Sequence, residues 1–132
     1  MKAGLGAWLA VLALGLPPAT LTAHHSFAAE YDASKPVTLK GTVTRVEWTN
    51  PHARFYVDVK DETGGVTNWN LELASPNVLT RNGWTRKSLN IGDEVSVEGA
   101  AAKDGSKMAN ARVVTLADGR RVFAFSLDTP AQ

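Results

Sequence analysis

The sequence contains no cysteine among its 132 residues, so neither a disulfide framework nor a thiolate metal site can form. Clustered basic side chains are also scarce, since no basic run exceeds two residues, the length of the pair Arg120 and Arg121. Nucleic-acid binding is driven by clustered lysine and arginine that neutralise phosphates. We therefore expect no nucleic-acid partner. What remains is an ordinary composition, 44% hydrophobic and 20% charged, with room for one domain.

A long hydrophobic run is missing as well. The apolar stretch 7–16 is too short to cross a bilayer, which needs about 20 apolar residues. It follows Lys2, and Pro17 and Pro18 end it. A charged start, an apolar centre and a small-residue exit are typical of a Sec-type signal peptide, with cleavage after Ala23. We predict a periplasmic or secreted protein without a stable membrane span after cleavage.

The predicted mature chain is electrically neutral. Removal of residues 1–23 takes away Lys2 and leaves 13 basic and 13 acidic side chains, so the formal net charge falls from +1 to zero. A neutral surface adds to the argument against a nucleic-acid partner.

Alternating apolar residues predict five strands. In the first strand the apolar phase shifts after Val43 to Val46, which indicates a β-bulge near Thr44 and Arg45. Turn sequences rich in Gly, Asn and Asp separate the strands, and Asp118-Gly119 can form a further hairpin to Val122. The predicted strands cover residues 37–48, 53–59, 68–73, 95–99 and 108–116.

One short helix is predicted between the third and fourth strands. Ser75 is a natural N-cap, Pro76 suits the first helical position, and Asn82-Gly83 suits the end. Three strands, a helix and two strands is the order of an all-β, OB-like five-stranded barrel. An open antiparallel sheet or a small sandwich would contain the same elements. The predicted organisation is a signal peptide, an N-terminal segment, the barrel domain and a tail, at 1–23, 24–36, 37–126 and 127–132.

The three histidines are the sharpest chemical feature of the chain. His24 and His25 would begin the mature protein, and His52 lies in the loop between the first two strands. An N-terminal histidine offers its α-amine and a ring nitrogen to one ion, and His52 would complete a nitrogen set that suits divalent transition metals, Cu(II) above the others. In the alternative interpretation, the first two histidines are a solvated terminus and His52 holds its loop.

A catalytic group is not evident. The carboxylates lie on strand exteriors and in turns, where solvation is the usual state. Ser26 stands beside His25, but a third group that would orient them is missing. We do not expect an enzyme. The carboxylates considered are Glu30, Asp32, Asp58, Glu72, Asp93 and Glu98.

Tryptophans and the loop after the first strand form a candidate ligand surface. OB-like barrels often bind ligands on the face of strands 2 and 3 and on adjoining loops. Trp48 directly precedes the loop that contains Asn50 and Pro51. Core packing is the expectation for Trp69, whereas Trp48 and Trp84 are expected to close the barrel ends.

Several motifs together resemble one family. They are Ala23-His24-His25-Ser26-Phe27, Glu30-Tyr31-Asp32, Val46-Glu47-Trp48-Thr49-Asn50-Pro51-His52 and Gly92-Asp93-Glu94-Val95. The chain from about Ala23 to Val122 is similar to bacterial exported proteins grouped as the domain of unknown function numbered 6152. The resemblance implies a small exported protein and places the family signature on His24, His25, Phe27, Trp48, Asn50, Pro51 and His52. It implies no activity, substrate or partner.

Two functional hypotheses follow. The first is a periplasmic binding protein that holds a divalent transition metal, copper above the others, through His24, His25 and His52. The second is a metal-free OB-like interaction module that recognises a partner protein or a small molecule through its strand face and the loop of Asn50, Pro51 and His52.

Overall fold

The computed structural model describes residues 27–124, which form six strands and two short helices. A helical turn precedes the first strand, and a second helix separates the third and fourth strands. The elements in chain order are α1 (Phe27–Glu30), β1 (Tyr31–Glu47), β2 (Arg54–Lys60), β3 (Val66–Glu72), α2 (Pro76–Arg81), β4 (Glu94–Ala102), β5 (Met108–Thr115) and β6 (Arg121–Phe123).

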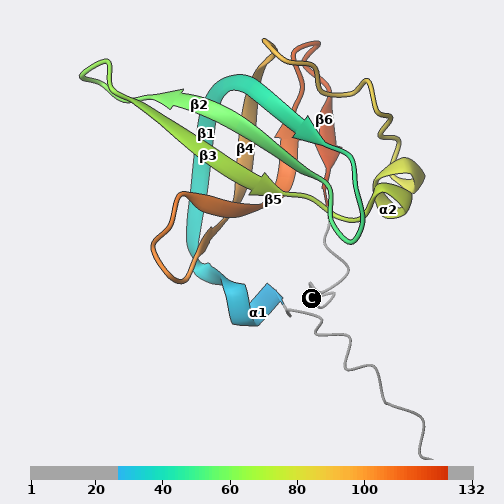
Figure 1. Ribbon diagram of the computed structural model, residues 1–132, viewed down its shortest axis with the longest axis horizontal. Coiled ribbons are helices and arrows are strands. Elements are labelled where there is room, and N and C mark those ends of the chain that lie inside the picture. The colour runs from blue at the N-terminus through green and yellow to red at the C-terminus, as the bar shows by residue number, and fades with distance from the viewer. Residues whose placement is uncertain (1–26, 125–132) are drawn as a thin grey trace, which may run out of the picture.

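Five of the strands close into a barrel. The hydrogen-bonded order is β3-β2-β1-β4-β5-β6, and a parallel pairing between β3 and β5 completes the ring. Figure 1 shows the long β1 curving across the molecule, with α1 at one end of the barrel and α2 at its side. This closure confirms the predicted OB-like barrel and excludes the alternative of an open sheet. β6 extends the second half of β5 outside the ring.

The local features of the strands follow from their residues. The register of β1 against β2 shifts between Val43 and Arg45, which confirms the predicted bulge. At Gly41 the backbones of β1 and β2 come close together, since a Cβ atom there would fall 2.4 Å from the backbone oxygen of Asp58. Only glycine allows this close approach of the two strands.

The predicted helix is confirmed as α2. The Ser75 hydroxyl accepts a hydrogen bond from the Val78 amide at 3.4 Å, and Pro76 occupies the first turn. Asn82 is the C-cap, and Gly83 follows it with a φ of 87°. This left-handed conformation is the one that glycine adopts at helix ends.

The barrel interior is an apolar core. Alternate residues of the strands point inward, and Leu79 of α2 and Trp84 cover one side. The Trp84 indole donates a hydrogen bond to the carbonyl of Phe123 at 3.0 Å, so its polar group is satisfied despite burial. Trp48 and Trp69 are half-buried and pack against this core. The largest fully buried apolar side chains inside are Phe55, Leu71, Leu73, Leu79, Val43, Val57, Val97, Val114 and Trp84.

A second, smaller apolar cluster lies outside the barrel. Phe27 of α1 and Tyr31 pack on Ala100, Ala102 and Met108, on the outer face of β4 and β5. We call these five residues the outer cluster. The helical turn α1 has no counterpart in the sequence prediction, and β1 begins at Tyr31, before the first alternating residues. Alternation could not reveal this start, because the register against β4 is irregular up to Pro36.

Candidate functional site

His52 is held in the turn between β1 and β2. Its ring is half-buried, and Nδ1 lies 3.2 Å from the carbonyl oxygen of Leu73. A carbonyl accepts only, so this hydrogen bond places the ring proton on Nδ1 and leaves the lone pair on Nε2. The same arrangement, with one ring nitrogen donating to a backbone carbonyl, orients most metal-binding histidines. His52 is therefore a pre-oriented donor of one nitrogen.

The other predicted site residues have different surroundings. His24 and His25 fall outside the described residues 27–124. Asn50 and Pro51 are exposed and are joined by a cis peptide bond. Trp48 is half-buried and packs against the barrel core, so only part of this side chain is open to a ligand.

His52 is not surrounded by further metal ligands within residues 27–124. In this part of the chain, no group of three or more His, Asp or Glu side chains is arranged to hold a metal ion.

Glu72 is the main departure from the sequence expectation, which treated its carboxylate as solvated surface. The residue is only 6% exposed. It points to the outer face of β3, and the N-terminal part of the chain covers it there: the Tyr31 hydroxyl donates to Glu72 Oε2 at 3.0 Å. Sequence alternation correctly placed Glu72 outside the barrel, but it could not show that another segment lies over this position.

A cation on the neighbouring strand neutralises the buried carboxylate. Arg54 is opposite Glu72 in the β2–β3 ladder, and its Nη2 lies 2.5 Å from Glu72 Oε2. Its Nη1 donates to Asn70 Oδ1 at 3.2 Å. A buried charge needs such partners, because an unpaired carboxylate away from water costs several kcal/mol, on the order of 3 to 5.

The phenol of Tyr31 is kept protonated by its surroundings. Burial, followed by the negative charge of Glu72, raises the pKa of Tyr31 above its usual value near 10. A protonated hydroxyl is the donor that the hydrogen bond to Glu72 requires. The phenol therefore keeps its proton, and can donate to Glu72, at pH values where an ordinary tyrosine would begin to ionise.

Two further polar side chains lie beside this network. Asn110 pairs with Glu72 across the β3–β5 ladder and is 1% exposed, yet within the described structure neither its Nδ2 nor its Oδ1 has a hydrogen-bond partner. The guanidinium carbon of Arg112 lies 5.5 Å from the centre of the Phe27 ring. We call Tyr31, Arg54, Glu72, Asn110 and Arg112 the outer polar network.

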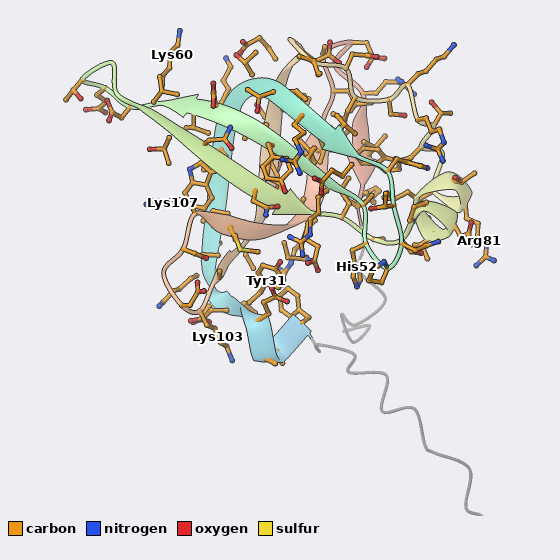
Figure 2. All side chains as sticks on the ribbon, viewed as in Figure 1. Tyr31, His52, Lys60, Arg81, Lys103 and Lys107 are labelled. Atoms are coloured by element: carbon orange, nitrogen blue, oxygen red, sulfur yellow. The ribbon has the colours of Figure 1, made fainter. Side chains whose placement is uncertain are left out.

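His52 and Tyr31 contact adjacent residues at the end of β3. Leu73, directly after β3, accepts the hydrogen bond of His52, and the preceding residue Glu72 accepts that of Tyr31. The rings of Tyr31 and Phe27 are 5.7 Å apart. Figure 2 shows His52 and Tyr31 at the same end of the barrel, whereas Lys60 lies at the far end of the β2–β3 hairpin.

Comparison with protein families assigns the chain. Residues 12–111 match the model of DUF6152, a family of unknown function, and the protein belongs to this family. This confirms the resemblance stated above. No curated protein matches the sequence. In the described residues, no helix is both long enough and apolar enough to cross a membrane.

Two solved structures are similar in fold. One is the mitochondrial single-stranded DNA binding protein Rim1 from S. cerevisiae, with 12% identity and a TM-score of 0.49 over 62% of this chain and 92% of that chain. The other is the N-terminal domain of PriB from Thermoanaerobacter tencongensis, with 19% identity and a TM-score of 0.43 over 63% of this chain and 96% of that chain.

The expectation that nucleic acid is excluded as a partner is corrected by this comparison. A protein of similar fold is a single-stranded DNA binding protein. The error lies in the use of total charge, because a chain with a net charge of zero can still gather basic side chains on one face. Net charge and the lack of a basic run therefore do not decide this class of partner.

Proposed function

We propose that the processed protein is a periplasmic binder of a divalent transition metal, copper above the others, with His24, His25 and His52 as its ligands. The observation that carries the proposal is the orientation of His52. The Leu73 carbonyl occupies Nδ1 at 3.2 Å, and Nε2 keeps its lone pair. Because the family has no known function, the donor chemistry of His52 is the best guide to the function of this protein.

The N-terminal histidines supply what His52 lacks. After cleavage behind Ala23, the α-amine and ring of His24 form a chelate with one ion, and imidazole and amine nitrogens favour copper in the stability order of first-row metals. Two residues lie between His24 and Phe27, and the three residue steps of an extended chain between them span about 10 Å. The proposal requires this segment to turn back over the outer face toward β2.

The α-amine gives the proposal its sharpest test. Cu(II) is titrated into a chain that begins at His24 and into one that retains Ala23. We expect tight binding to the first chain and much weaker binding to the second, because a peptide bond removes the amine from the ligand set. Indistinguishable weak binding to both would reject the proposal.

A second pair of variants tests the loop ligand. His52→Ala is expected to weaken binding of Cu(II) by the chain that begins at His24, whereas Thr49→Ala is expected to leave it unchanged. Thr49 is exposed in the same turn and serves as the matched control. Mass spectrometry of protein isolated from the periplasm would at the same time establish the first residue and any retained metal.

The second candidate is a metal-free interaction module that binds a partner protein or a small molecule. It is favoured by a cation–aromatic pair on the strand face, where the guanidinium of the exposed Arg45 lies 4.6 Å from the centre of the half-buried Tyr56 ring. Such pairs are common at binding surfaces. Capture from periplasmic extract with a chelator present should then be lost in Arg45→Ala and retained in a chain with His24→Ala and His25→Ala. The reverse pattern would exclude the module.

A further inference from the structure

One edge of the β2–β3 hairpin is open. β5 pairs with β3 only from Asn70 to Glu72, and within residues 27–124 no strand pairs with this side of β3 between Val66 and Trp69. Figure 1 shows the tip of the hairpin projecting from the barrel. An open edge presents unpaired backbone amides and carbonyls, which can form hydrogen bonds with another strand.

The backbone groups at this edge follow from the bonds of the neighbouring residue Asn70. Its amide donates to the carbonyl of Lys107 at 3.0 Å, on the side of β3 that faces away from β2. Successive residues of a strand direct their backbone groups to opposite sides, so the even-numbered residues of β3 face the open edge. In the described chain, the amides and carbonyls of Val66 and Asn68 are therefore the groups that have no strand opposite them.

This segment does not contain the usual protection of an open edge. Edges are commonly blocked by charged residues, proline or a bulge. Residues 66–69 contain no charged residue and no proline, and their register against β2 is regular. The Asn68 side chain turns away from the edge, because its Nδ2 donates to Asp58 Oδ1 at 2.8 Å and to Thr44 Oγ1 at 3.1 Å. The side chain of Val66 is 55% exposed, so the edge is accessible to another strand.

We propose that two copies of the protein pair through this edge as antiparallel strands, with Thr67 of each copy on the two-fold axis. In this register Val66 of one copy lies opposite Asn68 of the other, and each such pair exchanges both of its N–H···O bonds. All open backbone groups of the two copies are then satisfied. A two-fold contact uses the same surface on both copies, and this edge is complementary to itself in that way.

Charge favours a second copy over an unrelated extended peptide. In each copy, Lys107 Nζ lies 5.4 Å from the centre of the Trp69 ring. The proposed register places Gly65 opposite the partner's Trp69, and Gly65 has no side chain to collide with the indole. The exposed Glu62 in the turn before Gly65 then comes close to the partner's Lys107. Opposite charges therefore meet at both ends of the contact, and they steer two copies into this register.

The first test measures association of the chain that begins at His24, which contains every described element and lacks the apolar stretch 7–16. A chelator prevents histidines from bridging two copies through a metal ion. Sedimentation at up to about 1 mM protein should show a reversible dimer. Asn68→Pro removes an edge amide from each copy and should weaken association about tenfold or more. Asn68→Ala keeps the amide and should leave association nearly unchanged.

Charge variants at the two-fold axis test the register. Thr67→Lys places two like charges directly opposite each other, and so does Thr67→Glu, so each variant alone should lose most of its association. An equimolar mixture of the two variants should associate again, because opposite charges then meet. Circular dichroism checks that each chain is folded, and this pair of variants replaces Asn68→Pro should that chain not fold.

Hydrogen exchange gives a readout within the edge itself. The amides of Val66 and Asn68 should exchange slowly in concentrated protein and fast after dilution, whereas the Thr67 amide, which faces β2, should stay protected at both concentrations. A chain that is monomeric at every concentration would overturn the proposal. A dimer that Asn68→Pro leaves intact would also overturn it, as would Thr67→Lys and Thr67→Glu chains that associate as well alone as together.

Discussion

The barrel interior and the outer polar network are both buried, but they are built from opposite kinds of side chain. Inside, Phe55 and Leu71 are fully buried among other apolar residues. Outside the barrel, the buried groups include Glu72, Asn110 and the hydroxyl of Tyr31. Apolar burial is non-directional and stabilises in proportion to area, whereas buried polar groups stabilise only when they are paired in a defined geometry.

This difference assigns separate roles to the two regions. The interior sets the stability of the barrel, because burial of large apolar side chains is the dominant favourable contribution. The buried ion pair of the outer polar network adds little to the free energy of unfolding, because the cost of desolvating the two charges offsets most of the attraction between them. What it supplies is a fixed position for the N-terminal part of the chain.

The largest expected effect comes from truncation inside the barrel. Phe55→Ala should lower the free energy of unfolding by about 3 to 5 kcal/mol, because the side chain is fully buried and leaves a cavity. The same change in the outer cluster, Phe27→Ala, should cost about 2 kcal/mol. Urea denaturation of both variants measures the difference. Equal losses of unfolding free energy would show that the outer cluster stabilises the fold as strongly as the barrel interior does.

The ion pair of the outer polar network should give the next largest effect. Arg54→Met leaves the Glu72 carboxylate buried without a cation and should cost about 2 to 3 kcal/mol of unfolding free energy. The double variant Arg54→Met with Glu72→Leu should be more stable than Arg54→Met alone, since it contains no unpaired charge. Urea denaturation again provides the measurement, and a double variant as unstable as the single one would contradict this account.

The local sequence pattern predicted much of the fold but little of the outer polar network. The bulge after Val43 and the caps of α2 at Ser75 and Asn82 follow from short stretches of sequence, and the structure confirms them. The contact between Tyr31 and Glu72 joins distant parts of the chain across the outer face. Alternation along β3 assigns Glu72 to the exterior, where solvent is the usual neighbour, so only the placement of Tyr31 at the start of β1 reveals that it is buried.

The candidate site was likewise predictable only in part. The single histidine of the first inter-strand loop was identifiable from its residue type and position. The Leu73 carbonyl that orients it could not be predicted, because a backbone acceptor carries no sequence signal. His52 and Leu73 come together through the antiparallel pairing of β2 and β3.

Alkaline pH should weaken the outer polar network but not the apolar packing of the barrel interior. Burial raises the pKa of Tyr31, whereas the phenol of an unfolded chain ionises near pH 10. Unfolding above about pH 10 therefore releases a proton, and the free energy of unfolding falls as the pH rises further. Urea denaturation at about pH 8 and about pH 11 should show a larger loss in the unaltered chain than in Tyr31→Phe. Parallel losses in the two chains would mean that the phenol ionises equally well in the folded state.

The smallest expected effect concerns Asn110, a member of the outer polar network whose side-chain amide atoms lack hydrogen-bond partners within residues 27–124. Asn110→Leu keeps the shape of the side chain and removes an unsatisfied donor and acceptor, so the free energy of unfolding should change by less than about 1 kcal/mol, toward greater stability. Urea denaturation checks the value. A clear loss of unfolding free energy would show that the amide has a partner, such as an ordered water between Asn110 and Glu72. Every member of the outer polar network would then act through polar contacts, unlike the apolar side chains of the interior.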